Sequence, residues 1–419
     1  MTRTEGRVFG FWTLTFLVIA NMIGAGVFTT SGFTLAALGD THLVLLAWLI
    51  GGVIALSGAI SYGQLVRRIP VSGGEYAFLS QAAHPFAGFV AGWVSLLAGF
   101  SGAIAFAAVT LETYLPSPLP PKSLALLVVL LGVLAHGLNR KAGTIAQNSA
   151  VLLKLVLLLA FVGVSAWAFL SGKWEGATSA TDAATGSLPL LFGQSLVWIS
   201  LSYSGFNAGV YVAGEATSAR TVARAMVVGT AVVTGIYLLL NAVFVLAPPA
   251  ELVTGQADIA AVAAEWVGGE AFARLVRLVI ALALFTSVLS MMMAGPRVYS
   301  RMAEDGLLPG VLVIRPGRTW PPVVLQAALA ILLILIGTVQ SLLGYLGLTL
   351  SLCAAASVAC LLWGKRDVRV RGWAILAPAV FVTATLLSAV LLVLRDPWQA
   401  HGTVITLALG AGAYALRAR

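Results

Sequence analysis

Charged side chains are scarce in this chain. Only 9% of the 419 residues are Asp, Glu, Lys or Arg, whereas 60% are hydrophobic and the mean hydropathy is +0.99. In soluble globular domains about a quarter of the residues are charged, so this composition excludes an ordinary soluble fold. Apolar runs long enough to cross a bilayer recur along the whole chain, without a long polar domain between them. The sequence therefore predicts an all-α integral membrane protein.

Cysteine and histidine are also rare. The two cysteines, Cys353 and Cys360, lie within one apolar run, so a disulfide framework is not expected. The four histidines form no intramembrane cluster with Asp, Glu or Cys of the kind that binds a metal or carries out acid–base chemistry. A phosphate-binding Gly-x-x-x-x-Gly-Lys-Ser/Thr motif is absent as well. We therefore expect neither an enzyme nor an ATP-driven pump, and no cofactor or bound metal.

The formal charge of +9 does not indicate nucleic-acid binding, because the basic residues lie in short loops between apolar runs and are not clustered with aromatic residues. If the N-terminus is cytoplasmic, roughly eighteen of the 24 Lys and Arg residues fall in cytoplasmic loops and about five in outer loops. This bias predicts a multi-pass protein of the cell membrane with both termini cytoplasmic. The partners expected from it are the lipid bilayer and no nucleic acid, and no obligate protein partner is evident.

The apolar windows predict about twelve transmembrane helices. They are expected near residues 10–33, 43–66, 86–112, 123–138, 145–171, 188–214, 224–247, 273–299, 321–339, 341–363, 373–394 and 400–416. The more polar stretch 249–272 carries amphipathic patches and is expected to form short helices over the outer face. A loop without regular structure is the alternative for this stretch.

Two of these predicted spans are interrupted by small and polar residues. In VIANMIGAGVFTTSGF, residues 18–33, the interruption is Gly24, Ala25 and Gly26; in the sixth span it lies within ISLSYSGFNAGVYVAGE, residues 199–215. Glycine weakens a helix by about 1 kcal/mol relative to alanine, and at membrane depth a broken helix is tolerated where its freed backbone groups face protein or a water-filled cavity. One such run alone is more typical of close helix packing. The recurrence favours two broken helices.

The second interruption lies five spans after the first. Because five is odd, a second five-helix unit enters the membrane from the opposite side, so a repeat between the two units would be inverted. Interrupted segments at corresponding positions of two halves mark the substrate site of many transporters. The sequence therefore favours a carrier whose binding site lies between its two broken helices.

Broken helices offer backbone dipoles to a zwitterion. Amide N–H groups at Gly24, Ala25 and Gly26 would bind a carboxylate, and freed carbonyl groups near Met22, Leu201 and Ser204 an ammonium. Asn207 is a candidate for a polar contact with the substrate or with the broken helix. The full set of predicted substrate-binding residues is Met22, Ile23, Gly24, Ala25, Gly26, Leu201, Ser202, Tyr203, Ser204, Gly205 and Asn207.

Four ordered segments carry a further signal. They are IGAGVF at 23–28, RIPVSGGEYAFL at 68–79, SYSGFNAGVYVAGE at 202–215 and RVYSRMAEDGLLP at 297–309. Together they resemble the amino acid-polyamine-organocation (APC) superfamily, the amino acid permeases with the leucine-transporter fold. The resemblance implies two inverted five-helix repeats, residues 1–171 and 187–364, with discontinuous first and sixth helices. Two appended C-terminal helices follow at 373–416, and alternating access is implied around an amino acid site at the membrane midplane.

Lys154 is a lone ammonium in the fifth predicted span. A charge at the bilayer centre costs roughly 2.5–3.5 kcal/mol on insertion scales, although a lysine can also extend its ammonium to the interface. The resemblance implies another role, since sodium-independent members place a fifth-span lysine where sodium-coupled relatives bind the ion. Thr286, Ser287 and Ser290 are hydroxyls expected nearby. We hypothesise that Lys154 replaces sodium, as a fixed charge or as a proton carrier, which makes protons a candidate partner.

A gate is expected where Glu215, at the inner end of the sixth span, pairs with a cytoplasmic arginine such as Arg67 or Arg220. A solvated helix-end carboxylate is the alternative. Because the deep parts of the first, third, sixth and eighth spans lack Asp and Glu, no carboxylate is expected there for the extra cation of a basic substrate.

These patterns predict a secondary active transporter of neutral L-amino acids, sodium-independent and either proton-coupled or exchanging. The alternative within the same fold is a transporter of amines, polyamines or cationic amino acids. A channel would show polar stripes along several helices, and a membrane-embedded enzyme would show titratable clusters. The small-molecule amino acid is therefore the expected ligand.

Overall fold

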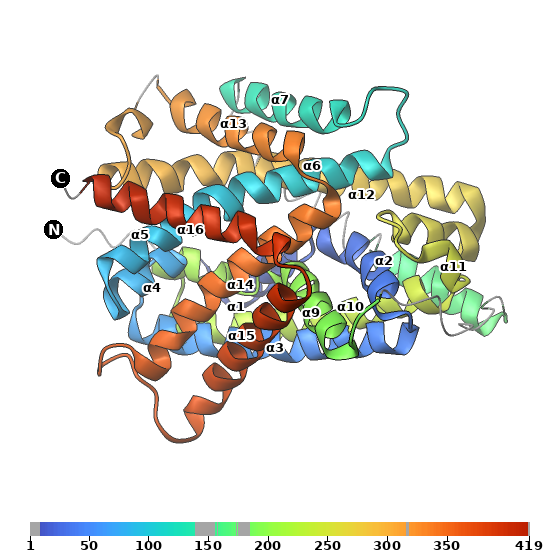
Figure 1. The fold of residues 1–419 in the computed structure, drawn as a ribbon, viewed down its shortest axis with the longest axis horizontal. Helices are drawn as coiled ribbons and strands as arrows, with labels where there is room; N and C mark the ends of the chain where they lie inside the picture. The colour runs from blue at the N-terminus through green and yellow to red at the C-terminus, as the bar shows by residue number, and fades with distance from the viewer. Residues whose placement is uncertain are drawn as a thin grey trace.

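The computed structural model of the chain describes residues 9–138, 156, 158–172, 174, 185–315 and 318–417. Within these ranges the secondary structure is helical, with two isolated β-bridges and no strand (Figure 1). The helices are α1 (Phe11–Met22), α2 (Gly26–Leu38), α3 (Thr41–Arg68), α4 (Gly74–Ala82), α5 (Pro85–Val94), the π-helix η1 (Ser95–Gly102), α6 (Ala103–Tyr114), α7 (Ser123–Leu138), α9 (Leu188–Tyr203), the 3₁₀ helix η2 (Ala208–Glu215), α10 (Ala219–Leu246), α11 (Ala250–Val253), α12 (Ile259–Glu304), the 3₁₀ helix η3 (Gly310–Leu312), α13 (Trp320–Ile336), α14 (Val339–Trp363), the 3₁₀ helix η4 (Gly372–Ile375), α15 (Leu376–Arg395) and α16 (Trp398–Arg417).

Several of these helices are long and apolar enough to cross a membrane. Within the described ranges six qualify, and the bent pair α1 and α2 gives a seventh if it counts as one span. Shorter apolar helices cover 123–134, 158–170 and 320–336. The protein is therefore a multi-pass, all-helical membrane protein, as the composition predicted. The count of twelve spans stays a prediction, and the fifth predicted span, 145–171, is described only in part.

The first predicted span is interrupted at its glycines. Helix α1 ends at Met22, α2 begins at Gly26, and the two halves meet at a bend of 44°. Ile23 leaves the helical region at ψ 86°, and the N–H of Gly24 turns back to the carbonyl of Met22 at 2.8 Å. The second half then continues to Leu38, so the predicted end at residue 33 was wrong. The small residues leave room for the chain to turn, so the backbone hydrogen bonds of α2 are able to begin again after the break.

The sixth predicted span, 188–214, is also interrupted. Helix α9 ends at Tyr203, and the chain resumes after Asn207 as η2, a 3₁₀ rather than an α-helix. Gly205 lies between them at φ +104°, a backbone conformation that side chains other than glycine rarely adopt. Both interruptions thus lie at the small and polar residues that the sequence singles out.

The helices form two groups (Figure 1). Helices α6, α7, α12 and α13 pack against one another in the upper half of the view, and α1, α3, α9, α10 and α15 in the lower half. Helix α14 contacts members of both groups. The stretch 249–272 is helical, as expected, since α11 and the first turns of α12 cover it up to a left-handed kink at Gly269, φ +77°.

Candidate functional site

Both interruptions open onto one cavity of about 1300 Å³. All eleven residues predicted to bind substrate line it, and the hydroxyl residues Thr286, Ser287 and Ser290 of α12 line it as well. The cavity extends along α1 to its first turn, where Phe9 and Trp12 line it and Trp12 is 67% exposed. This end is called the open end below. The π-helix η1 also contributes to the wall, a feature that the sequence did not reveal, and such π-bulges are frequent at functional sites.

Open amide groups lie where the first span restarts. Within the described residues the N–H groups of Ala25, Gly26 and Val27 have no hydrogen-bond acceptor, while that of Phe28 bonds to the carbonyl of Ala25 at 3.1 Å. Ala25 and Gly26 line the cavity at the N-terminus of the 13-residue helix α2. Unpaired N–H groups at a helix N-terminus carry partial positive charge and bind anions. The part of the cavity next to Ala25 and Gly26 is therefore suited to a carboxylate.

The two broken helices touch directly beside these amides. A Cβ atom on Gly26 would lie 2.5 Å from Ser202 Oγ and 2.9 Å from Ser202 Cα, so a larger residue would push α2 away from α9. Thr30 Oγ1 completes the contact, with 3.0 Å to Ser202 Oγ and 2.7 Å to the carbonyl of Gly26. Gly26 is thus required for the close approach of the first and sixth spans.

The carbonyl groups at the interruptions are only partly free. The hydroxyl of Tyr237 on α10 lies 2.6 Å from the carbonyl oxygen of Met22 and 3.0 Å from that of Ser202, and so links both broken helices. The carbonyl of Leu201 accepts the N–H of Ser204 at 3.0 Å. Within the described part of the chain no donor reaches the carbonyl oxygen of Ser204. Of the three predicted acceptors for an ammonium, Ser204 is therefore the one that remains open. Sequence reasoning missed Tyr237, a single tyrosine in an apolar run.

Glu75 is a second residue that sequence reasoning did not assign. It lines the cavity from the first turn of α4, although its side chain is only 6% exposed. Its carboxylate accepts hydrogen bonds from the hydroxyls of Tyr62 and Tyr211 and from the amide of Asn207. Asn207 is thus directed at Glu75 in this structure. The signal that was available is the RIPVSGGEYAFL segment, which the sequence analysis used for the family resemblance and to which it assigned no role in the site.

Gly26 is the last residue of α2 that lines the cavity; beyond it α2 packs against the segment after α11, and this region is called the sealed end below. The N–H of Gly255 donates to the carbonyl of Gly32 at 2.8 Å, and a Cβ on Gly32 would overlap the carbonyl of Gln256. Nearby, Ser31 bonds to Asn241 and accepts the indole N–H of Trp48 at 2.8 Å. The segment that follows α11 therefore fits against α2 with no space for a side chain between them.

The remaining predicted residues are placed as follows. Glu215 is exposed and its backbone carbonyl accepts the N–H of Phe9, whereas Arg67 Nε donates to the carbonyl of Gly63 at 2.9 Å. The ion pairs within the described ranges do not include Glu215 with Arg67, so the gate stays a prediction. Lys154 lies outside the described residues. Thr286 and Ser287 each donate to the carbonyl of Ala283 at 2.9 Å, and their ion-coupling role also stays a prediction.

No group of three His, Cys, Asp or Glu residues suited to a metal ion occurs in the described ranges. The single charged residue among the described ones that line the cavity is Glu75, and its carboxylate is fully engaged by neutral donors. The described lining of the cavity offers backbone groups, hydroxyls and aromatic surface.

Comparison with known proteins places this cavity in a functional context. The sequence profile of a family described as "Amino acid permease" matches residues 9–401. The chain is 27% identical over 339 residues to the serine/threonine exchanger SteT of Bacillus subtilis (strain 168), covering 78% of this chain and 76% of the relative. It is 27% identical over 375 residues to the large neutral amino acids transporter small subunit 2 of Mus musculus, covering 84% and 70%. It is 26% identical over 424 residues to the cystine/glutamate transporter of Homo sapiens, covering 96% and 83%.

Proposed function

Because the chain belongs to the amino acid permease family, a family of transporters and not of enzymes, we propose that it is a secondary transporter of neutral L-amino acids that works by alternating access. The observation that carries the proposal is the meeting of two broken helices at one cavity, where the amide groups of Ala25, Gly26 and Val27 have no acceptor among the residues that the structure describes. The relatives named for serine and threonine and for large neutral amino acids support the same substrate class.

The backbone groups supply both ends of the proposed binding mode. The substrate carboxylate lies on the N–H groups of Ala25 and Gly26, where the dipole of α2 favours negative charge. The substrate ammonium lies against the free carbonyl of Ser204. Both charges are thereby met without a buried ionised side chain, which would be costly at membrane depth.

The residues of the cavity wall favour a substrate with an uncharged side chain. Among its described lining residues there is no Lys, Arg or His, and its one acidic residue, Glu75, already accepts three hydrogen bonds. The alternative is a cationic amino acid, amine or polyamine, and Glu75 is the observation that favours it, because a carboxylate on the wall is what such a ligand requires.

The packing of the helices supports the proposed twelve-helix fold with inverted repeats, residues 1–171 and 187–364, and the appended pair at 373–416. Helices that correspond in the two repeats are in contact: α2 with α9, α3 with α10, α6 with α12 and α7 with α13. Contact between corresponding elements is expected when two repeats are related by a pseudo-two-fold axis through the site.

In the proposed orientation the protein lies in the cell membrane with both termini cytoplasmic. The open end, next to Phe9 and Trp12, then faces the cytoplasm, and the sealed end, next to Gly32 and Gln256, faces outward. The structure would accordingly represent an inward-facing state of the cycle. The basic residues of the loops support this orientation.

The proposed coupling is sodium-independent, with Lys154 in the role of the ion and Thr286, Ser287 and Ser290 beside it. The Lys154→Ala variant is expected to lose uptake or its pH dependence. Unchanged uptake with an unchanged pH profile would refute this part of the proposal.

Uptake into proteoliposomes tests the function. Radiolabelled L-serine and L-leucine are offered in sodium-free buffer, with and without a proton gradient and with unlabelled amino acid inside the vesicles, against a panel of unlabelled competitors. We expect saturable uptake that neutral L-amino acids inhibit and that internal substrate accelerates. Inhibition by arginine or diamines alone would select the cationic alternative, and uptake without saturation would indicate a channel.

A further inference from the structure

Two of the four family-like segments, 68–79 and 297–309, have no part in the proposed binding mode. The structure places the first of them against the second half of the interrupted sixth span, residue by residue. Ser72 Oγ accepts a hydrogen bond from the N–H of Gly214 in η2 at 3.0 Å. The contact therefore begins at the far end of η2 and continues toward the break.

The two glycines that follow Ser72 allow the close approach. Gly73 and Gly74 adopt φ +133° and +56°, which strain any residue with a side chain. A Cβ on Gly74 would overlap the ring of Tyr211. The Ser-Gly-Gly run thus shapes a surface on which η2 rests.

Glu75 makes the strongest contact of this surface. Its Oε1 accepts from Tyr62 Oη at 2.7 Å and from Asn207 Nδ2 at 2.5 Å, and its Oε2 accepts from Tyr211 Oη at 2.6 Å. Within the described ranges it forms no ion pair, so these neutral donors are what offsets the burial of the carboxylate. Two of the three donors, Asn207 and Tyr211, belong to the interrupted sixth span.

The segment that Glu75 contacts depends on outside support. Helix η2 is a 3₁₀ helix of eight residues, and Val212 within it departs from helical geometry at φ −118°, ψ 17°. Runs of 3₁₀ helix longer than three or four residues are uncommon because their hydrogen bonds are poorly aligned. At the last residue of η2 the chain pairs with Phe9, whose N–H donates to the carbonyl of Glu215 at 3.2 Å. Contacts with other segments, rather than its own ladder, therefore fix η2.

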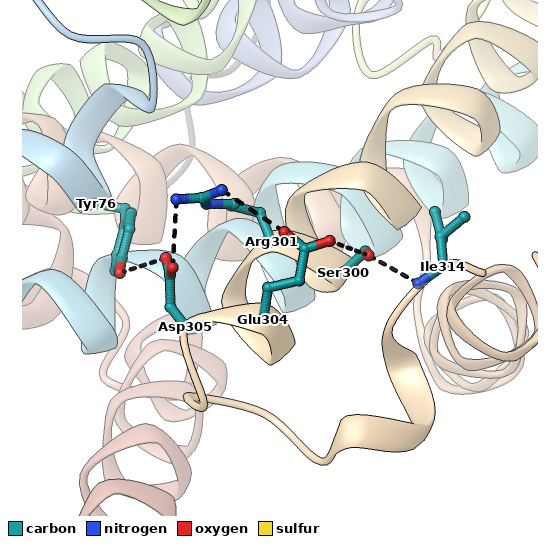
Figure 2. A network of polar contacts seen from close by, with 6 residues as sticks. All are labelled: Tyr76, Ser300, Arg301, Glu304, Asp305 and Ile314. Atoms are coloured by element: carbon teal, nitrogen blue, oxygen red, sulfur yellow. Dashed lines mark hydrogen bonds and ion pairs between the residues drawn. The ribbon is translucent and has the colours of Figure 1, made fainter. Parts of the chain in front are cut away.

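Tyr76, the residue after Glu75 on α4, faces the segment 297–309. Figure 2 shows Tyr76 turned toward the end of α12, where its hydroxyl donates to Asp305 Oδ2 at 3.3 Å. Asp305 also lies 3.4 Å from Arg301, and this network is exposed (Figure 2). The contacts of Glu75 with η2 are partly buried whereas that of Tyr76 with Asp305 is exposed, so solvent competes more strongly with the second.

We propose that Glu75 is a positioning residue of the transport site. Its carboxylate holds residues 207–211 against α4 and so fixes the wall of the cavity next to the break in the sixth span. The role of this contact in transport rests on the proposed function, whereas the contact of Glu75 with residues 207–211 does not.

Hydrogen exchange of the full-length protein in detergent measures how strongly Glu75 stabilises residues 207–215, and it needs no substrate. In Glu75→Gln, which keeps the side-chain size but removes the charge, amides in 207–215 are expected to exchange about tenfold faster. Tyr211→Phe should shift them in the same direction. Tyr62→Phe is the matched control, since it removes a hydroxyl from the same carboxylate but belongs to α3, and it should change exchange in 207–215 by less than about twofold. Peptides from α10 report whether each variant is folded.

Uptake of L-serine gives the second measurement. The KM is expected to rise about tenfold in Glu75→Gln and in Tyr211→Phe, with a smaller change in maximal rate, because the wall is displaced rather than lost. Unchanged exchange in 207–215 in both variants would overturn the proposal, as would an effect of Tyr62→Phe equal to that of Tyr211→Phe. If the wild-type protein takes up no amino acid while exchange responds as expected, the proposed function fails and the positioning role stands.

Discussion

The two helix breaks are built differently. The first spans only Ile23 to Ala25, and regular α-helix resumes at once, with its first amide groups unpaired among the described residues. The sixth span resumes instead as a 3₁₀ helix, and its polar residue Asn207 is held by a carboxylate from another segment. The first break therefore presents binding groups at the start of a regular helix, whereas the second continues as an irregular segment held by a side chain of α4.

This difference separates two tasks that a carrier must combine. A ligand needs donors that are already in place, and α2 supplies them as part of an intact helix. The proposed alternating access would need a segment whose contacts can be exchanged, and η2, with a weak hydrogen-bond ladder of its own, is the candidate that the structure offers. The effects of substitutions at the two breaks should therefore differ in size and in the property that they change.

The largest effect is expected from Gly205→Ala in the second break. Alanine at φ +104° is strained, and its Cβ would lie 2.8 Å from the carbonyl oxygen of Asn21. Together these terms amount to about 3 kcal/mol, which corresponds to a roughly 100-fold loss of L-serine uptake per folded protein. Gly235→Ala, with no atom within 4 Å of the added Cβ, serves as the control. Near-normal uptake by Gly205→Ala would contradict the conformation described for this break.

Next in size is Gly26→Ala in the first break. Its Cβ would press on Ser202 Oγ and Cα at 2.5 and 2.9 Å, so α2 must shift away from α9, and we expect a loss of uptake of about 30-fold. Gly24→Ala is the matched comparison, because its nearest neighbour is the Met22 carbonyl oxygen at 3.9 Å. Uptake by Gly24→Ala should stay within about threefold of wild type. Equal losses in both variants would mean that glycine is needed here for flexibility and not for contact.

A smaller effect is expected from Tyr237→Phe, which removes the hydroxyl shared by Met22 and Ser202. Loss of this link leaves the buried Ser202 carbonyl without a donor among the described residues, whereas the Met22 carbonyl keeps the N–H of Gly24. It should cost about 1–2 kcal/mol, seen as a lower thermal unfolding midpoint and a roughly tenfold weaker substrate affinity. Tyr345→Phe removes a hydroxyl that bonds to Thr406 instead, away from both breaks, and should lower stability alone. A change of affinity in Tyr345→Phe as large as in Tyr237→Phe would argue against the special role of the link.

The smallest effect is expected from Thr30→Val, which keeps the shape of the side chain. It removes the hydrogen bonds to the Gly26 carbonyl and to Ser202 but leaves the helices in contact, so the KM for L-serine should rise by no more than about fivefold. Thr34→Val, whose hydroxyl bonds within α2 only, should not change the KM. A rise of more than tenfold in Thr30→Val would show that this hydroxyl contacts the substrate itself.

Much of the fold follows from the sequence because it depends on local composition. Apolar length identifies the membrane helices, and glycine with small polar residues places the interruptions at 24–26 and 202–207, where the structure ends α1 and α9. The end of the first span was misplaced at residue 33. Helix α2 continues to Leu38, and it accommodates the polar Thr34 because the hydroxyl bonds to the Thr30 carbonyl within the helix.

The parts that the sequence did not show depend on contacts between distant segments. Glu75 lies more than 130 residues from Asn207, and the short helix α4 that carries it has no sequence pattern that would place it in a cavity wall. Tyr237 is one aromatic residue in an apolar helix, where packing is the usual role. The π-helix in the third span has no composition signature, since its extra residue per turn is set by packing against its neighbours.

Helix α2 has a mechanical consequence for the cycle. Its open amides and its contact with Gly255 are separated by about six residues, or roughly 9 Å of regular helix, which is too short to bend appreciably. A ligand bound at the amides and the segment at Gly255 would therefore both contact the same stiff helix. In the proposed cycle, a tilt of α2 that separates it from Gly255 would also reorient the amide groups that hold the ligand, so opening at the sealed end would be coupled directly to whether the site is occupied.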